Sequence, residues 1–121
     1  MKLGYTILYV PDVGQTVAFY EAAFGLERRF VHEAGDYAEL ETGQTVLAFA
    51  SDALASSNFE LAYRHTDPNA APPAFEIVLV TDDVAGAVQP ANNAHASSLA
   101  EPSEKPWGQT VSYVRDLNGV I

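Results

Sequence analysis

The chain has 121 residues, of which 48% are hydrophobic, 11% aromatic and 18% charged. This length and balance are typical of one folded globular domain, and they exclude disordered and fibrous chains. Sixteen acidic against six basic residues give a formal net charge of -10, so the average field repels phosphate backbones and anionic lipids. We therefore expect no nucleic-acid partner and no membrane partner, whereas cationic small molecules would be attracted.

Cysteine is absent, which excludes disulfides, thiolate metal sites and cysteine nucleophiles. The N-terminus shows no basic region followed by the apolar run of a signal peptide, and no segment approaches the roughly 20 apolar residues of a membrane span. These features predict a cytoplasmic protein.

The first half of the chain predicts the order β, α, β, β, β. Residues 3–10 are apolar or β-favouring and end at Pro11, which predicts a strand. Asp12 is a good helix N-cap and Gly25 a good C-terminal stop, and apolar residues recur between them at helical spacing. A helix is therefore expected over about 13–24. Turn residues then separate three short predicted strands, at about 26–32, 37–42 and 45–51.

The second half repeats the beginning of this order after a connector at about 53–73, which is rich in Ala, Ser, Asn and Pro. Residues 75–84 can be laid over residues 4–13 at an offset of 71, which predicts a strand followed by a helix. The helix should start after Asp82 or Asp83, and Gly86 and Pro90 should make it short or irregular.

The last quarter of the chain predicts two strands and a turn. The strands are expected at 95–99 and 109–115, with a proline-containing loop over 101–108 between them. Residues 116–119, Asp-Leu-Asn-Gly, form a strong turn signal, after which Val120 and Ile121 begin a further strand.

Several short motifs, in this order, carry a family resemblance. They are Tyr-Val-Pro-Asp-Val at 9–13, Ala-Phe-Tyr at 18–20, Phe-Gly-Leu at 24–26, Pro-Trp-Gly-Gln at 106–109 and Arg-Asp-Leu-Asn-Gly at 115–119. Together they resemble the glyoxalase, bleomycin-resistance and extradiol-dioxygenase group, the vicinal oxygen chelate superfamily. The resemblance implies an α+β fold of two paired βαβββ modules whose sheets curl around a cleft, and it implies a homodimer. Module one would span about 1–52 and module two about 74–121 of a single domain, with the last strand incomplete.

The resemblance also implies where a divalent metal would bind in the family's enzymes. The family's ligand positions fall on Tyr5, on Ala48 or Phe49, and on Glu76, while the fourth lies beyond Ile121. A protonated phenol is a poor metal ligand, and alanine and phenylalanine offer no donor atom. Because a zinc site normally needs three or four protein ligands, a metal-free protein is favoured.

We therefore expect a small-molecule-binding protein of the bleomycin-resistance type, which holds a planar or cationic compound in an acidic, aromatic cleft. The expected ligand-binding residues are Tyr5, Phe49, Glu76, Trp107 and Tyr113. The alternative is a metal-dependent lyase, isomerase or dioxygenase of the same superfamily, with Glu76 as one metal ligand. A third possibility is a small interaction module without a ligand. Whether the protein is an enzyme stays open at this stage, as does the identity of the ligand.

The histidines and one pair of glutamates are further polar residues whose roles the sequence suggests. The histidines His32, His65 and His95 show no metal-binding spacing and are expected on the surface or in loops. Glu39 and Glu41 share a side of one predicted strand, where they are either paired carboxylates for acid-base chemistry or part of a solvated face.

Overall fold

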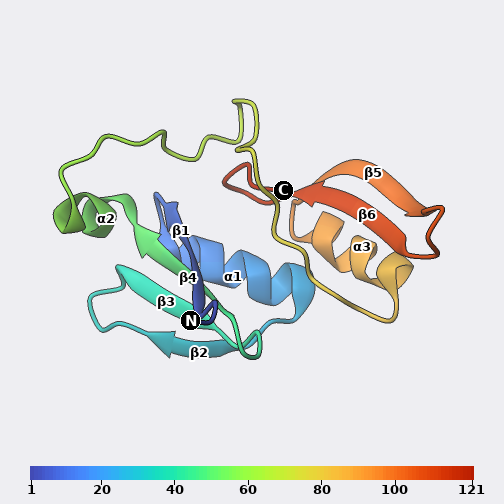
Figure 1. Cartoon of the computed structure of the whole chain (residues 1–121), viewed down its shortest axis with the longest axis horizontal. Helices are drawn as coiled ribbons and strands as arrows, with labels where there is room; N and C mark the ends of the chain where they lie inside the picture. Colours follow the sequence, from blue (N-terminus) through green and yellow to red (C-terminus); the bar gives the residue numbers. More distant parts are fainter. The chain divides into compact units, whose positions relative to one another are not determined.

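The computed structural model describes residues 1–121 and divides them into two compact units. Unit 1 comprises residues 1–21 and 25–66, and unit 2 comprises residues 22–24 and 67–121. Figure 1 shows the elements of each unit. None of the helices is both long enough and apolar enough to cross a membrane.

Unit 1 is built around a four-stranded sheet in the order β1-β4-β3-β2 (Figure 1). Strand β1 spans Tyr5–Val10 and pairs in parallel with β4, Val46–Ser51. Strand β3, Tyr37–Leu40, pairs antiparallel with both β4 and β2, Arg28–Val31. The predicted β, α, β, β, β order of the first half is confirmed.

Helix α1 spans Val13–Phe24, as its capping signals predict. The Asp12 carboxylate accepts a hydrogen bond from the Gln15 backbone N–H, and Gly25 ends the helix in a left-handed conformation at φ 66°. The helix packs on one side of the sheet, where the rings of Tyr20 and Phe49 lie 5.1 Å apart. The core of unit 1 lies between this helix and this side of the sheet, with buried residues Leu8, Val10, Val13, Val17, Tyr20, Ala38, Leu40, Leu47 and Phe49.

Part of the predicted connector is helical. Helix α2 spans Asp52–Asn58, and the Ser51 hydroxyl caps it by accepting a hydrogen bond from the Leu54 N–H at 3.1 Å. The sequence predicted a connector here without a helix in it, and alanine and serine next to an N-cap favour a helix as readily as a loop.

Unit 2 contains one helix and a two-stranded antiparallel sheet. Helix α3 spans Val84–Asn93, and Asp83 caps it by accepting from the Gly86 N–H at 2.8 Å. The predicted start is confirmed, and Pro90 lies inside the helix, where it cannot donate to the carbonyl four residues before it.

The sheet of unit 2 differs from its prediction at one end. Strand β5, Ser97–Glu104, runs into the predicted loop and pairs with β6, Thr110–Arg115. Its register shifts between Ala100 and Ser103, which is where Pro102 stands. A bulge tolerates proline because a ladder hydrogen bond is already missing there, and this explains why the proline did not end the strand.

The strand predicted at the start of the second half is not formed. Residues 75–80 lie outside any strand, and Val80 is 93% exposed. The Ile77 N–H donates to the Ile121 carbonyl at 2.8 Å, so the segment has a single point of backbone pairing. Apolar and β-branched residues favour a strand, but a strand also needs a continuous partner ladder.

The turn after β6 forms as predicted. The buried Asp116 carboxylate accepts from the backbone N–H groups of Asn118 and Val120, at 2.8 and 2.9 Å. The Arg115 guanidinium donates to the carbonyl oxygens of Gly119 and Ala70, at 2.9 and 3.0 Å. The turn is therefore tied to the start of unit 2.

Candidate functional site

The sheet of unit 1 has a second side, opposite α1, which carries most of its tyrosines. Strand alternation places Tyr5, Ile7 and Tyr9 on this side of β1, and the register sets Ala48 beside Ile7 and Glu39 beside Ala48. We call this surface the tyrosine face and define it by seven residues, Tyr5, Ile7, Tyr9, Phe30, Tyr37, Glu39 and Ala48. The tyrosine face is largely apolar, and part of it is nevertheless open to solvent, since Tyr5 is 50% exposed and Phe30 is 48% exposed.

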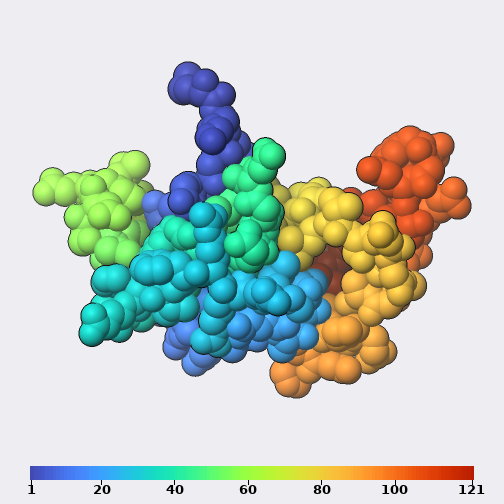
Figure 2. Space-filling view, turned by 90° about the horizontal axis from the view of Figure 1, so that it is seen from below, coloured from blue at the N-terminus to red at the C-terminus, as the bar shows by residue number.

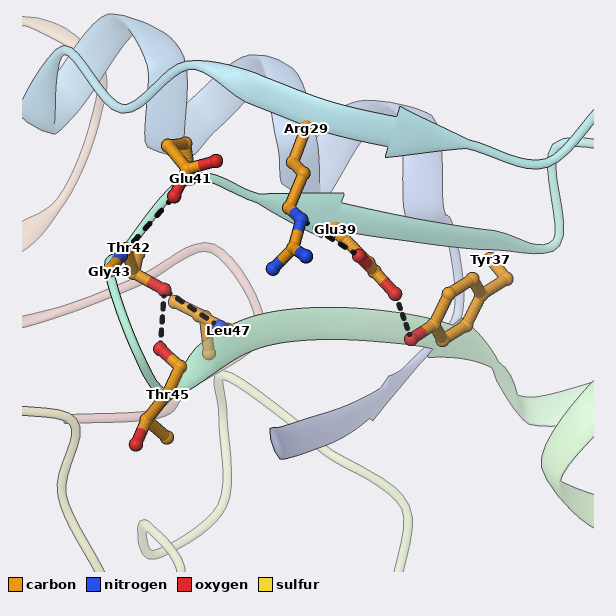
Figure 3. A network of polar contacts seen from close by, with 8 residues as sticks. All are labelled: Arg29, Tyr37, Glu39, Glu41, Thr42, Gly43, Thr45 and Leu47. Atoms are coloured by element: carbon orange, nitrogen blue, oxygen red, sulfur yellow. Dashed lines mark hydrogen bonds and ion pairs between the residues drawn. The ribbon is translucent and has the colours of Figure 1, made fainter. Parts of the chain in front are cut away.

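A carboxylate lies in the middle of this face. The Glu39 side chain is only 14% exposed, and its Oε1 accepts a hydrogen bond from the Tyr37 hydroxyl at 3.0 Å. Its Oε2 lies 3.6 Å from Nε of Arg29, so Glu39 stands between a phenol and a guanidinium (Figure 3). A half-buried carboxylate with two polar partners among aromatic rings can bind a cation or a hydrogen-bond donor.

A β-bulge brings Arg29 to this position. The register of β2 and β3 shifts between Arg28 and Phe30, and Phe30 is the residue opposite Glu39. A bulge sets two successive residues against one on the neighbouring strand and redirects a side chain. Arg29, which simple alternation would place on the opposite side from Phe30, therefore reaches the same glutamate.

Tyr37 keeps its proton in this setting. Burial and the hydrogen bond to the Glu39 carboxylate raise the pKa of Tyr37 to about 12, because an anionic phenolate would be poorly solvated next to a negative charge. The hydroxyl is therefore a fixed donor to Glu39 at neutral pH, and the carboxylate keeps its second oxygen for another partner.

Glu39 and Glu41 do not form a carboxylate pair. Glu41 follows the last residue of β3, and its carboxylate accepts from the Gly43 N–H at 3.4 Å in the turn toward β4 (Figure 3). The sequence left two interpretations open for Glu39, a paired acid-base carboxylate or a residue of a solvated face. Neither holds, because Glu39 is largely buried and its partners are Tyr37 and Arg29. The register could not be known from the sequence, and neither could the bulge.

The predicted site residues of unit 1 lie on opposite sides of its sheet. Tyr5 belongs to the tyrosine face, whereas Phe49 is fully buried beneath α1 and contacts Tyr20. Alternation along β4 places Ala48, and not Phe49, on the same side as Tyr5. Phe49 is therefore a core residue of this sheet, and the two side chains do not form one site.

The other three predicted residues belong to unit 2. Glu76 is exposed in the segment that precedes α3, and Tyr113 is half-buried in the middle of β6. Trp107 is 70% exposed in the turn between β5 and β6, where its indole N–H donates to Oε1 of Gln109 at 2.7 Å. Their part in ligand binding stays a prediction.

A second aromatic cluster lies at the end of β1, also in unit 1. The ring of Tyr63 is 5.2 Å from that of Tyr9 and 6.1 Å from that of Phe59. The Asp52 carboxylate accepts from the Tyr63 hydroxyl at 2.6 Å and lies 3.1 Å from Nδ1 of His65. Burial, reinforced by Asp52, raises the pKa of Tyr63. The cluster packs the segment after α2 against the sheet.

The histidines lie where the sequence predicts them. His32, His65 and His95 are all exposed, and two of them pair with a nearby aspartate. No group of three or more His, Cys, Asp or Glu side chains is arranged to hold a metal ion.

The metal that the family resemblance implies can be tested against the donor atoms present. On the tyrosine face Tyr5 offers a phenol, and Ala48 offers only a methyl group. Glu39, the carboxylate of this face, already accepts a hydrogen bond from Tyr37 and has no second carboxylate or imidazole grouped with it, whereas a bound metal normally needs three or four protein ligands. The residues of unit 1 therefore do not fit a metal held in the family's manner, and we derive no chemical step through one.

Comparison with known proteins identifies the fold class. The family model described as "Glyoxalase/Bleomycin resistance protein/Dioxygenase superfamily" matches residues 2–121. The chain belongs to this superfamily, as the ordered motifs predict, and its α+β fold is that of glyoxalase-like proteins. No curated protein matches its sequence significantly.

Solved structures agree with this fold at low sequence identity. A glyoxalase-related enzyme from Fulvimarina pelagi matches with a TM-score of 0.81 at 19% identity, covering 99% of this chain and 84% of that chain. A protein of unknown function from Agrobacterium tumefaciens str. C58 matches with a TM-score of 0.79 at 21% identity, covering 99% and 89%. A glyoxalase/bleomycin resistance protein/dioxygenase from Nocardioides matches with a TM-score of 0.74 at 16% identity, covering 99% and 79%.

Proposed function

We propose that the protein binds a planar, cationic small molecule on the tyrosine face of unit 1. The observation that carries this proposal is the half-buried Glu39 carboxylate, held by Tyr37 in the middle of a largely aromatic surface. Aromatic rings stack on planar compounds and attract cations, and a carboxylate in a partly desolvated place attracts them further.

The charge of the whole chain supports the same ligand class. A net charge of -10 raises the local concentration of cations around the protein and repels anions. Glu39 would then supply the short-range selection, because it is a charged side chain at the centre of the face. Membership of a superfamily that includes bleomycin resistance proteins is consistent with a binding function.

The test is equilibrium binding of proflavine, a planar cationic dye, followed by fluorescence anisotropy. We expect saturable binding that E39Q weakens by about tenfold, which corresponds to about 1.4 kcal/mol. E41Q is the matched control, since it removes the same charge two residues further on but from a side chain that faces the turn (Figure 3). The planar anion fluorescein should not bind.

Two results would contradict the proposal. One is the absence of saturable binding to the folded wild-type protein. The other is equal weakening by E39Q and E41Q, because this would show that the dye responds to the overall negative charge and not to Glu39. The variant W107F in the same assay separately tests the prediction that Trp107, the only tryptophan in the chain, takes part in ligand binding.

A further inference from the structure

A positively charged side chain of the protein, Arg29, already lies beside the carboxylate of the tyrosine face. Arg29 lies with Nε 3.6 Å from Oε2 of Glu39, so the pair is formally neutral before any ligand arrives. Tyr37 occupies the other carboxylate oxygen with a 3.0 Å hydrogen bond. Only Oε2 of Glu39 is free of the Tyr37 hydroxyl, and this is the oxygen beside which the Arg29 guanidinium lies. A ligand cation that approaches Glu39 therefore competes with Arg29 for Oε2.

The structure holds Arg29 more loosely than Tyr37. A separation of 3.6 Å is too long for a good hydrogen bond, and the Arg29 side chain is 43% exposed. It extends from β2, which is the edge strand of the sheet, and it stands at the bulge. A guanidinium in this position can turn into solvent when another cation takes its place at Glu39, because the Arg29 side chain is itself already partly exposed to water.

We infer that Arg29 is an internal competitor that a cationic ligand displaces from Glu39. It sets a threshold for binding, because weakly basic or neutral compounds cannot replace its charge, whereas a planar cation with N–H donors can. This inference rests on the proposed function, since it concerns the same face and the same carboxylate. It assigns Arg29 to ligand selection and not to stability.

The neighbouring arginine provides a matched control. Arg28 forms an ion pair with Glu21 at 2.7 Å, on the opposite side from Glu39, and it changes the net charge by the same amount when replaced. R28Q therefore reports the general effect of one less positive charge, and R29Q reports this effect together with the loss of the competitor.

The experiment measures proflavine affinity for wild type, R29Q, R28Q, E39Q and the double variant R29Q/E39Q, with circular dichroism as the check on folding. We expect R29Q to bind about fivefold more tightly than wild type, and R28Q to stay within about twofold. When Glu39 has been replaced by Gln, the further change R29Q should alter the proflavine affinity no more than R28Q does, because there is no carboxylate left for which Arg29 and the dye compete. R29K, which keeps the charge, should bind as wild type does.

Two outcomes separate this inference from the proposed function. If E39Q weakens binding but R29Q and R28Q have equal effects, the competition is overturned and the binding proposal stands. If R29Q tightens binding equally with and without Glu39, Arg29 acts through long-range charge alone, and the inference is again overturned. Failure of the folded wild-type protein to bind proflavine overturns both.

Discussion

The hydroxyl of Tyr37 donates to Oε1 of Glu39 at 3.0 Å, and both side chains stand on the same side of β3. This pair connects strand geometry to electrostatics, because residues two apart in a strand share a side and can reach one another. The hydrogen bond fixes the carboxylate in the tyrosine face, and it makes the protonation of Tyr37 a measurable reporter of that face.

The first prediction concerns this protonation. Burial and Glu39 raise the pKa of Tyr37 to about 12 in the folded protein, above the unfolded value near 10. A raised folded pKa stabilises the protein fully below the unfolded value, and this contribution is lost as the pH rises from about 10 through 12. Subtracting the tyrosinate absorbance titration of Y37F from that of wild type should leave one transition centred near pH 12.

The control for this titration is E39Q. Without the carboxylate the transition of Tyr37 should move to lower pH, although burial still keeps it above the ordinary value. A Tyr37 transition near pH 10 in the wild-type protein would contradict the assignment of the hydrogen bond and of the partly buried environment.

The second prediction separates the two aromatic residues of unit 1 that the sequence assigned to one site. Phe49 is fully buried against Tyr20, so Phe49→Ala should lower the free energy of unfolding by about 3 to 5 kcal/mol. Tyr5 is half exposed, so Tyr5→Ala should change it by no more than about 0.5 kcal/mol. Urea unfolding measures both, and equal costs would show that the two sides of the sheet have been wrongly distinguished.

The third prediction uses two glycines of unit 2 that share a left-handed backbone. Gly119 has φ 88°, and an added Cβ would collide with the Arg115 guanidinium, the Asp67 carbonyl and Pro68. Gly108 has φ 93° with open space around it. Both Gly→Ala variants should lose about 1 to 2 kcal/mol of stability through backbone strain. Gly119→Ala should lose about 1 to 3 kcal/mol more through overpacking.

The measurement is again urea unfolding of the two variants side by side. Gly108→Ala is the control, because it carries the conformational strain without the collision. If the two variants proved equally stable, the close packing of the Asp116–Gly119 turn against residues 67–70 would not hold in solution.

The fourth prediction concerns the end of α3. His95 has φ 70°, and it occupies the left-handed position of a Schellman motif, in which the Ala96 N–H donates to the Ala91 carbonyl at 3.0 Å. Glycine adopts this conformation without strain, so His95→Gly should stabilise the protein by about 0.5 to 1 kcal/mol. His95→Ala, which removes the side chain but keeps the strain, should give no gain in the thermal midpoint.

The homodimer and the cytoplasmic location stay predictions. The first can be checked by the mass of the protein in solution, on the same samples that are used for dye binding.

The sequence by itself determined the elements that local signals control. Asp12 and Gly25 mark the ends of α1, and short apolar or β-favouring runs bounded by proline or turn residues mark β1 and β4, because capping groups and local propensity act within a few residues. The ordered motifs also identified the superfamily, since they reflect the fold as a whole.

Only the tertiary structure decided which residues meet. The β2 bulge brings Arg29 to Glu39, and the β3–β4 register places Glu39 beside Ala48, so a carboxylate that could have been solvated becomes part of an aromatic face. Residues 75–80 have the composition of a strand but lack a partner ladder. In each case the deciding interaction joins backbone segments from different strands, and the spacing within one segment carries no information about its partner.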